Sequence, residues 1–143
     1  MRLPPLAFLL VACAHPAFAA EPSMADRAAI FEAAGYKPDG ARWIRCEEDP
    51  PTAAYQPGSI ELQDLNGDGT PEAWVRESSS FCYGAAAEHV TLLRRDGTQW
   101  RVLLESAGIA LPHETKRHGW PDIEVGGPNA STVYHWTGST YTP

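Results

Sequence analysis

The chain folds around one stretch, Asp64-Leu65-Asn66-Gly67-Asp68-Gly69-Thr70-Pro71-Glu72. Oxygen-bearing side chains stand at its first, third and fifth positions, a glycine follows the third of them, and a carboxylate stands at the ninth position. A Ca²⁺ ion takes about six to eight oxygen ligands, and a tightly curled loop can supply most of them from one short segment. The pattern therefore predicts a calcium site formed by the side chains of Asp64, Asn66 and Asp68, the backbone carbonyl of Thr70 and the carboxylate of Glu72.

The residues on both sides of this loop predict strands. A helix-loop-helix calcium site carries a bidentate glutamate at its twelfth position, where this chain has Val75. Residues 59–63 and 72–76 alternate in polarity, and Pro71 opposes a helix that would start in the loop. We therefore expect the loop to connect the two strands of a β-hairpin. The alternative is a metal-free turn, since Asn-Gly and Asp-Gly form tight turns unaided, although three carboxylates so close together repel one another without a counter-ion.

The N-terminus has the features of an export signal. Arg2 precedes a short apolar run, and Ala17-Phe18-Ala19 fits the small-x-small preference of signal peptidase. We predict a signal peptide at residues 1–19 and a single exported domain at residues 20–143, which would be periplasmic or secreted. The apolar run is too short for a permanent transmembrane segment. The alternative is a lipobox that ends at Cys13, which would make the protein an outer-membrane lipoprotein.

Charge and cysteine content narrow the class of protein. The chain has 11 Lys and Arg against 18 Asp and Glu residues, a formal net charge of −7, which argues against binding to nucleic acid or to anionic membrane surfaces. Cys46 and Cys82 are the two cysteines outside the leader, and in an exported chain they predict a disulfide. The bridge would span the loop, so we expect bridge and ion to brace the same region. A cysteine metal site or nucleophile is the rival interpretation, but no partner stands at ligand spacing.

The rest of the chain predicts one helix and a series of strands. Ser23 and Asp26 mark the start of a helix expected from Met24 to about Gly35, and its apolar positions have helical spacing. A loop is expected at residues 37–41. Alternating stretches divided by turn signals follow the hairpin, whereas residues 106–119 predict irregular structure. The fold class is therefore α+β, mostly β, with an antiparallel sheet of five to seven strands and one N-terminal helix.

Two groups of residues are candidates for contacting a ligand. By alternation Trp74 shares a strand face with Arg76, and if Ala73 and Val75 face the core, the indole could stack on a ligand near the ion. Packing of Trp74 in the core is the alternative. Residues 113–118, which include His113 and His118, form the densest polar cluster. Their spacing matches no zinc or nucleophile pattern, so an exposed loop is the simpler interpretation.

The sequence also resembles known families. The segment from Asp64 to Glu72 with its flanking strands looks like the calcium loops of dockerins and of integrin-type FG-GAP repeats, where the loop sits in a β-hairpin and the ninth residue is a ligand. The chain from Cys46 to Tyr141, with Phe81-Cys82-Tyr83-Gly84 and Gly119-Trp120-Pro121-Asp122-Ile123, is similar to small exported proteins of proteobacteria. The resemblance implies export and calcium binding. It does not imply the partners of dockerins or integrins, because the loop occurs once here.

These observations favour a periplasmic, calcium-binding structural or ligand-binding module, monomeric by default. Its partner would be an unknown protein or envelope ligand. The alternative is a cell-envelope enzyme or enzyme inhibitor with a cleft near Trp74, Arg76 and the loop at residues 113–118.

Overall fold

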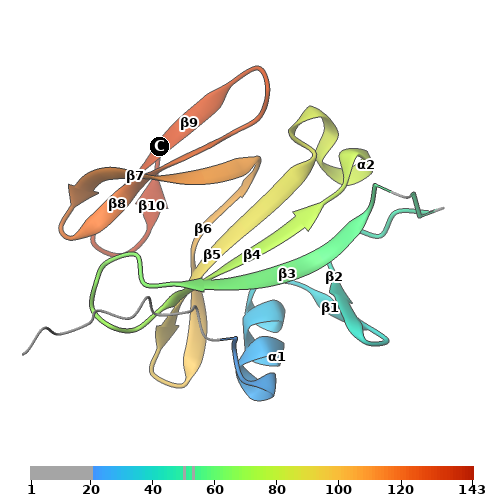
Figure 1. The fold of residues 1–143 in the computed structure, drawn as a ribbon, viewed down its shortest axis with the longest axis horizontal. Coiled ribbons are helices and arrows are strands. Elements are labelled where there is room, and N and C mark those ends of the chain that lie inside the picture. The colour runs from blue at the N-terminus through green and yellow to red at the C-terminus, as the bar shows by residue number, and fades with distance from the viewer. Residues whose placement is uncertain (1–20, 50, 53) are drawn as a thin grey trace, which may run out of the picture.

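Antiparallel strands dominate the computed structural model, which describes residues 21–49, 51–52 and 54–143 (Figure 1). The proposed signal peptide and Cys13 lie outside the described residues. In chain order the elements are α1 (Met24–Ala33), β1 (Lys37–Asp39), β2 (Arg42–Ile44), β3 (Gln56–Gln63), β4 (Glu72–Ser78), α2 (Ser80–Tyr83), the 3₁₀ helix η1 (Gly84–Ala86), β5 (Glu88–Asp96), β6 (Gln99–Ala107), β7 (Ile109–Arg117), β8 (Trp120–Gly126), β9 (Ser131–Trp136) and β10 (Tyr141–Thr142).

The strands form three sheets in the described part of the chain. The first sheet has the order β3-β4-β5-β6, the second has the order β10-β9-β8-β7, and β1 pairs with β2 in a small hairpin. The chain passes from the first sheet to the second at Gly108, between β6 and β7. Gly108 has a φ of 131°, and a side chain there would collide with the backbone of Gly126. A residue with a Cβ would be strained at this crossing.

The mostly β, antiparallel α+β class is confirmed, but the expected single sheet of five to seven strands is wrong. In residues 21–143, apart from positions 50 and 53, ten strands lie in three sheets. Residues 37–41, expected as a loop, contribute to the β1-β2 hairpin, and residues 109–117, expected to be irregular, form β7. Strand β7 lies at an edge and is exposed over most of its length, so it lacks the apolar alternation of a half-buried strand.

The predicted N-terminal helix is present, although its end differs. The Ser23 side chain accepts a hydrogen bond from the Asp26 backbone N–H at 3.1 Å, so Ser23 is the N-cap as expected. The helix ends at Ala33, before the predicted end at Gly35. The short helix α2 was not predicted; there the Ser79 side chain caps the first turn by accepting from Cys82 N–H.

The first sheet packs against other elements on both of its faces, and its central strands β4 and β5 are the most buried. Figure 1 shows α1 and the β1-β2 hairpin on one side of it and the second sheet on the other. Ala73 and Val75 of β4 pack with Ile30 and Phe31 of α1, whereas Trp74 packs with the apolar side chains of the second sheet. Each face of β4 therefore contributes to a core of its own, and the structure has three layers.

Candidate functional site

The loop at residues 64–71 connects β3 to β4, and Gln63 pairs with Glu72 across its base. These two strands are antiparallel neighbours. The loop therefore sits in a β-hairpin, as the alternation of its flanks predicts.

Hydrogen bonds from the loop's own backbone hold its polar side chains. Asp64 accepts from Gly67 N–H at 2.8 Å and from Gly69 N–H at 2.9 Å, one bond on each carboxylate oxygen. Asn66 accepts from Asp68 N–H at 2.8 Å, and Asp68 accepts from Thr70 N–H at 2.7 Å. Gly67 and Gly69 have φ values of 77° and 86°, a left-handed backbone that favours glycine. The loop thus curls around the side-chain oxygens of Asp64, Asn66 and Asp68.

Glu72 brings a third carboxylate to this loop from the first residue of β4. Its residue is only 3% exposed, and its Oε2 accepts from Leu65 N–H at 2.9 Å. The pKa of Glu72 is raised to about 7, chiefly by burial and also by the carboxylates of Asp68 and Asp64, against the opposing effect of the Leu65 N–H. The carboxylates of Asp68 and Asp64 therefore disfavour a charge on Glu72, and the guanidinium of Arg94 opposes them with a smaller effect.

The donor set predicted for calcium is only partly made of acidic side chains. Asn66 would supply an amide oxygen and Thr70 a backbone carbonyl, besides the three carboxylates. Among the described residues, no group of three or more His, Cys, Asp or Glu side chains is placed so that it could hold a metal ion. The carboxylates of Asp64 and Asp68 instead accept hydrogen bonds from loop N–H groups.

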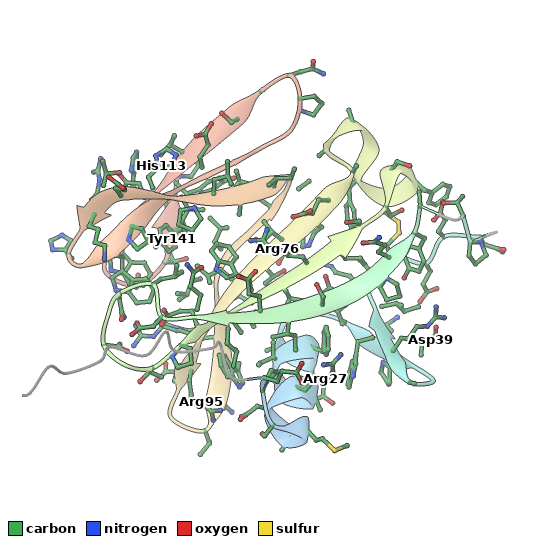
Figure 2. All side chains as sticks on the ribbon, in the orientation of Figure 1. Arg27, Asp39, Arg76, Arg95, His113 and Tyr141 are labelled. Atoms are coloured by element: carbon green, nitrogen blue, oxygen red, sulfur yellow. A yellow bond between two sulfur atoms is a disulfide. The ribbon has the colours of Figure 1, made fainter. Side chains whose placement is uncertain are left out.

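Trp74 lies in the core and not on an outer face. Its residue is 0% exposed, and its Nε1–H donates to Gln63 Oε1 at 3.0 Å. The core-packing interpretation is therefore confirmed, and the indole has no open face on which a ligand could stack. Arg76 lies with its guanidinium 5.2 Å from the Trp74 ring and pairs with Glu88 at 3.1 Å. Both side chains of this ion pair are partly exposed, and Arg76 lies on the same face of β4 as Trp74, on the first sheet (Figure 2).

The predicted disulfide between Cys46 and Cys82 is present. Cys82 lies in α2, which follows the end of β4, whereas the acidic loop precedes the start of β4. The expectation that bridge and loop brace the same region is therefore wrong, because the full length of β4 separates them.

A buried carboxylate beside the bridge was missed by the sequence analysis. Glu77 is 1% exposed and accepts hydrogen bonds from the backbone N–H groups of Arg45 and Cys46, both at 3.0 Å, and from the hydroxyl of Tyr83. The Tyr55 hydroxyl lies 3.4 Å from the carboxylate and donates to the Cys46 carbonyl at 2.8 Å. The period of two along β4 was a usable signal, since it places Glu77 on the same face as Ala73 and Val75.

The polar cluster at residues 113–118 is not a loop, because most of it lies in β7. His113 Nε2 lies 2.9 Å from Glu124 Oε2 on β8, and Ser131 of β9 donates its hydroxyl to Glu124 Oε1. The carboxylate thus stands between the serine and the histidine. In a Ser-His-Asp triad the histidine stands in the middle and takes the serine proton, so this row does not have the triad order.

A second His-carboxylate pair follows on the same face of β8. His135 Nδ1 lies 2.8 Å from Asp122 Oδ1, and Thr115 donates to Asp122 Oδ2 at 3.0 Å. The hydrogen bond with His135 contributes most to lowering the pKa of Asp122. Figure 2 shows His113 on the second sheet and Arg76 on the first, so the hypothetical cleft near both would have to include both sheets.

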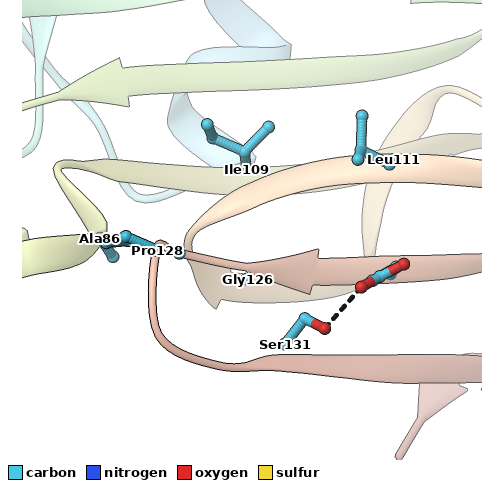
Figure 3. A pocket seen from close by; sticks show the side chains of 8 residues that line it. Ala86, Ile109, Leu111, Gly126, Pro128 and Ser131 are labelled. Carbon is cyan, nitrogen blue, oxygen red and sulfur yellow. Dashed lines mark hydrogen bonds between the residues drawn. The ribbon is translucent and has the colours of Figure 1, made fainter.

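A cavity of about 440 Å³ lies beside Glu124 and Ser131 on the second sheet (Figure 3). The residues that line it are Ala86, Ile109, Leu111, Glu124, Gly126, Gly127, Pro128 and Ser131. Neither Trp74 nor Arg76 lines it. The sequence analysis did not identify this cavity, because its residues come from η1, β7, β8, β9 and the β8-β9 turn, which only the fold brings together.

Comparison of the chain with protein-family models, with curated proteins and with solved structures found no match. In the described part of the chain, neither α1 nor α2 has the length and apolar character that a membrane-spanning helix requires.

Proposed function

We propose that the protein is an exported, calcium-stabilised structural or ligand-binding module whose calcium site is the loop from Asp64 to Glu72. The observation that carries this proposal is the position of Glu72. The buried carboxylate of Glu72, at the start of β4, lies near the loop carboxylates of Asp64 and Asp68. The negative charges of these two groups raise the pKa of Glu72. A divalent cation would remove that repulsion and convert it into attraction.

The loop offers the oxygen ligands that Ca²⁺ prefers. Asp64, Asn66 and Asp68 would turn oxygens to the ion that now accept hydrogen bonds from loop N–H groups, Thr70 would add its carbonyl, and Glu72 would close the site from the strand. Calcium sites of extracellular modules bind with dissociation constants of about 10⁻⁴–10⁻³ M. Such a site would be filled where the surroundings supply the ion.

The disulfide supports the exported location. Disulfides persist in oxidising compartments such as the periplasm and the extracellular space and are rare in the cytosol, and Cys46 and Cys82 are bonded here. The bridge is compatible with either a soluble periplasmic form or an anchored form.

Thermal unfolding in EDTA and in excess calcium tests the calcium site. At a calcium concentration one hundred times the dissociation constant, linkage predicts stabilisation by about 2.7 kcal/mol. The double variant Asp64→Asn/Asp68→Asn should lose this response, because it removes two negative charges, while each amide keeps one oxygen that can accept a loop hydrogen bond. Asp96→Asn, at the exposed end of β5, is the matched control and should keep it. A parent protein whose midpoint is the same in EDTA and in calcium would refute the site.

A further inference from the structure

The outer face of the second sheet places a carboxylate between exposed aliphatic side chains. Glu124 on β8 pairs directly with Leu111 of β7 on one side and with Val133 of β9 on the other. Leu111 is 57% exposed and Val133 is 36% exposed, and Ile109, two residues before Leu111, is 51% exposed. Charged and apolar groups thus alternate across three neighbouring strands.

The Glu124 carboxylate is fixed in place and still has capacity to accept. Ser131 donates to one oxygen and His113 lies against the other, whereas each carboxylate oxygen has two lone pairs. The hydrogen bond with Ser131 and, after it, that with His113 lower the pKa of Glu124, so the group stays ionised at neutral pH. A carboxylate of lowered pKa is a weak base, which makes it better suited to holding a cation than to abstracting a proton.

The cavity beside Glu124 has apolar walls. Ile109, Leu111, Ala86 and Pro128 supply aliphatic surface, and Glu124 is the only charged residue among those that line the cavity. At one end the β8-β9 turn approaches η1 so closely that a Cβ on Gly127 would stand 3.3 Å from the Cα of Ala86 (Figure 3). The volume of about 440 Å³ lies within the range of small-molecule sites, roughly 300–1,000 Å³.

We propose that this cavity binds a small aliphatic amine, with the ammonium group on Glu124 and the hydrocarbon chain against Ile109 and Leu111. The amine satisfies both features of the site at once, because an aliphatic chain without charge leaves the carboxylate unused and an anion meets it with repulsion. The net charge of −7 also favours the approach of cations. The proposal names a ligand site for the module proposed above, but it does not depend on the calcium loop, which lies on the first sheet.

Titration of ¹⁵N-labelled protein with hexylamine, followed by NMR, tests the proposal. Hexanol and hexanoate serve as probes of equal chain length. We expect saturable shifts of the Gly126 and Gly127 amide signals, with a dissociation constant for hexylamine at least tenfold lower than for either other probe. The titrations are run in calcium and again in EDTA, so that failure of the calcium site and failure of the amine site are seen separately.

Variants then assign the two parts of the interaction. Glu124→Gln should reduce the affinity for hexylamine to within about twofold of that for hexanol, whereas Glu114→Gln, on the exposed part of β7, should leave it unchanged. Leu111→Ser changes an exposed side chain and should weaken hexylamine and hexanol alike, which tests the site even if Glu124→Gln fails to fold. Equal or tighter binding of hexanoate or hexanol, an absence of saturation, or equal shifts around the exposed Phe81 would overturn the proposal.

Discussion

Replacing Glu77 by leucine removes the acceptor on which three donors converge beside the disulfide. They are the backbone N–H groups of Arg45 and Cys46 and the hydroxyl of Tyr83, whereas the hydroxyl of Tyr55 keeps the Cys46 carbonyl as its acceptor. Leaving a buried donor without a partner costs about 1–3 kcal/mol. Since some of these donors are only part-buried and the effects are not additive, we expect the Glu77→Leu variant to lose about 3–5 kcal/mol of unfolding free energy. For a domain of this size that corresponds to roughly 10–20 °C in the unfolding midpoint.

Urea unfolding of the oxidised protein measures this loss. Glu77→Gln should give an intermediate value, because the amide keeps one accepting oxygen but turns an NH₂ group toward the other donors. Glu61→Gln, an exposed carboxylate on β3, is the matched control and should change the free energy by no more than about 0.5 kcal/mol. A loss below about 1 kcal/mol in Glu77→Leu would show that the donors do not depend on this carboxylate. It would refute the claim that the hydrogen bonds to Glu77 stabilise the fold.

Three further predictions follow from the core, the bridge and a buried histidine. Trp74→Ala should lower the unfolding free energy by about 3–5 kcal/mol in urea titrations, since the ring is fully buried; a loss below 1 kcal/mol would contradict its place in the core. Replacing both Cys46 and Cys82 by serine should lower it by about 3–4 kcal/mol, whereas unchanged stability would mean that the bridge constrains little. Burial and, after it, the Arg45 guanidinium lower the pKa of His89, so the unfolded state binds the proton more readily. His89 should therefore cost stability as pH drops below about 6.5, whereas Glu72, whose pKa is raised, should add stability over the same range. The unfolding free energy of His89→Gln relative to that of the parent should accordingly increase from pH 7 to pH 5; a constant difference between the two proteins would contradict the role of His89.

The features that the sequence predicted correctly are those with local signals. The hairpin follows from alternation on both sides of a glycine-rich turn, and helix α1 follows from the Ser23 cap and an apolar stripe. The disulfide follows from an even cysteine count together with the export signal. Each of these depends on residues within one element or on the cysteine count of the whole chain, and none requires knowledge of which strands are neighbours.

The features that the sequence did not predict depend on tertiary arrangement. The outer-face hypothesis for Trp74 assumed that β4 has one solvent-exposed face, whereas β4 is a central strand covered on both faces. The chain leaves the first sheet for the second at Gly108. Nothing in the sequence except the residue type indicates the positive φ of this glycine. Glu124 could not be singled out among 18 acidic residues, because its neighbours Leu111 and Val133 are set by strand pairing.

Strand β4 explains how the proposed calcium site, the bridge and the cavity can coexist. The acidic loop lies before Glu72 at its start, and Glu77 with the disulfide lies at its end, about 20 Å away by the rise of a seven-residue strand. The acidic loop and the disulfide therefore lie at opposite ends of the most buried strand of the first sheet. That sheet contributes to both cores, so in the proposed function it supports the second sheet. The outer face of the second sheet carries exposed apolar residues and an ionised carboxylate, and the proposed ligand site there lies outside both cores.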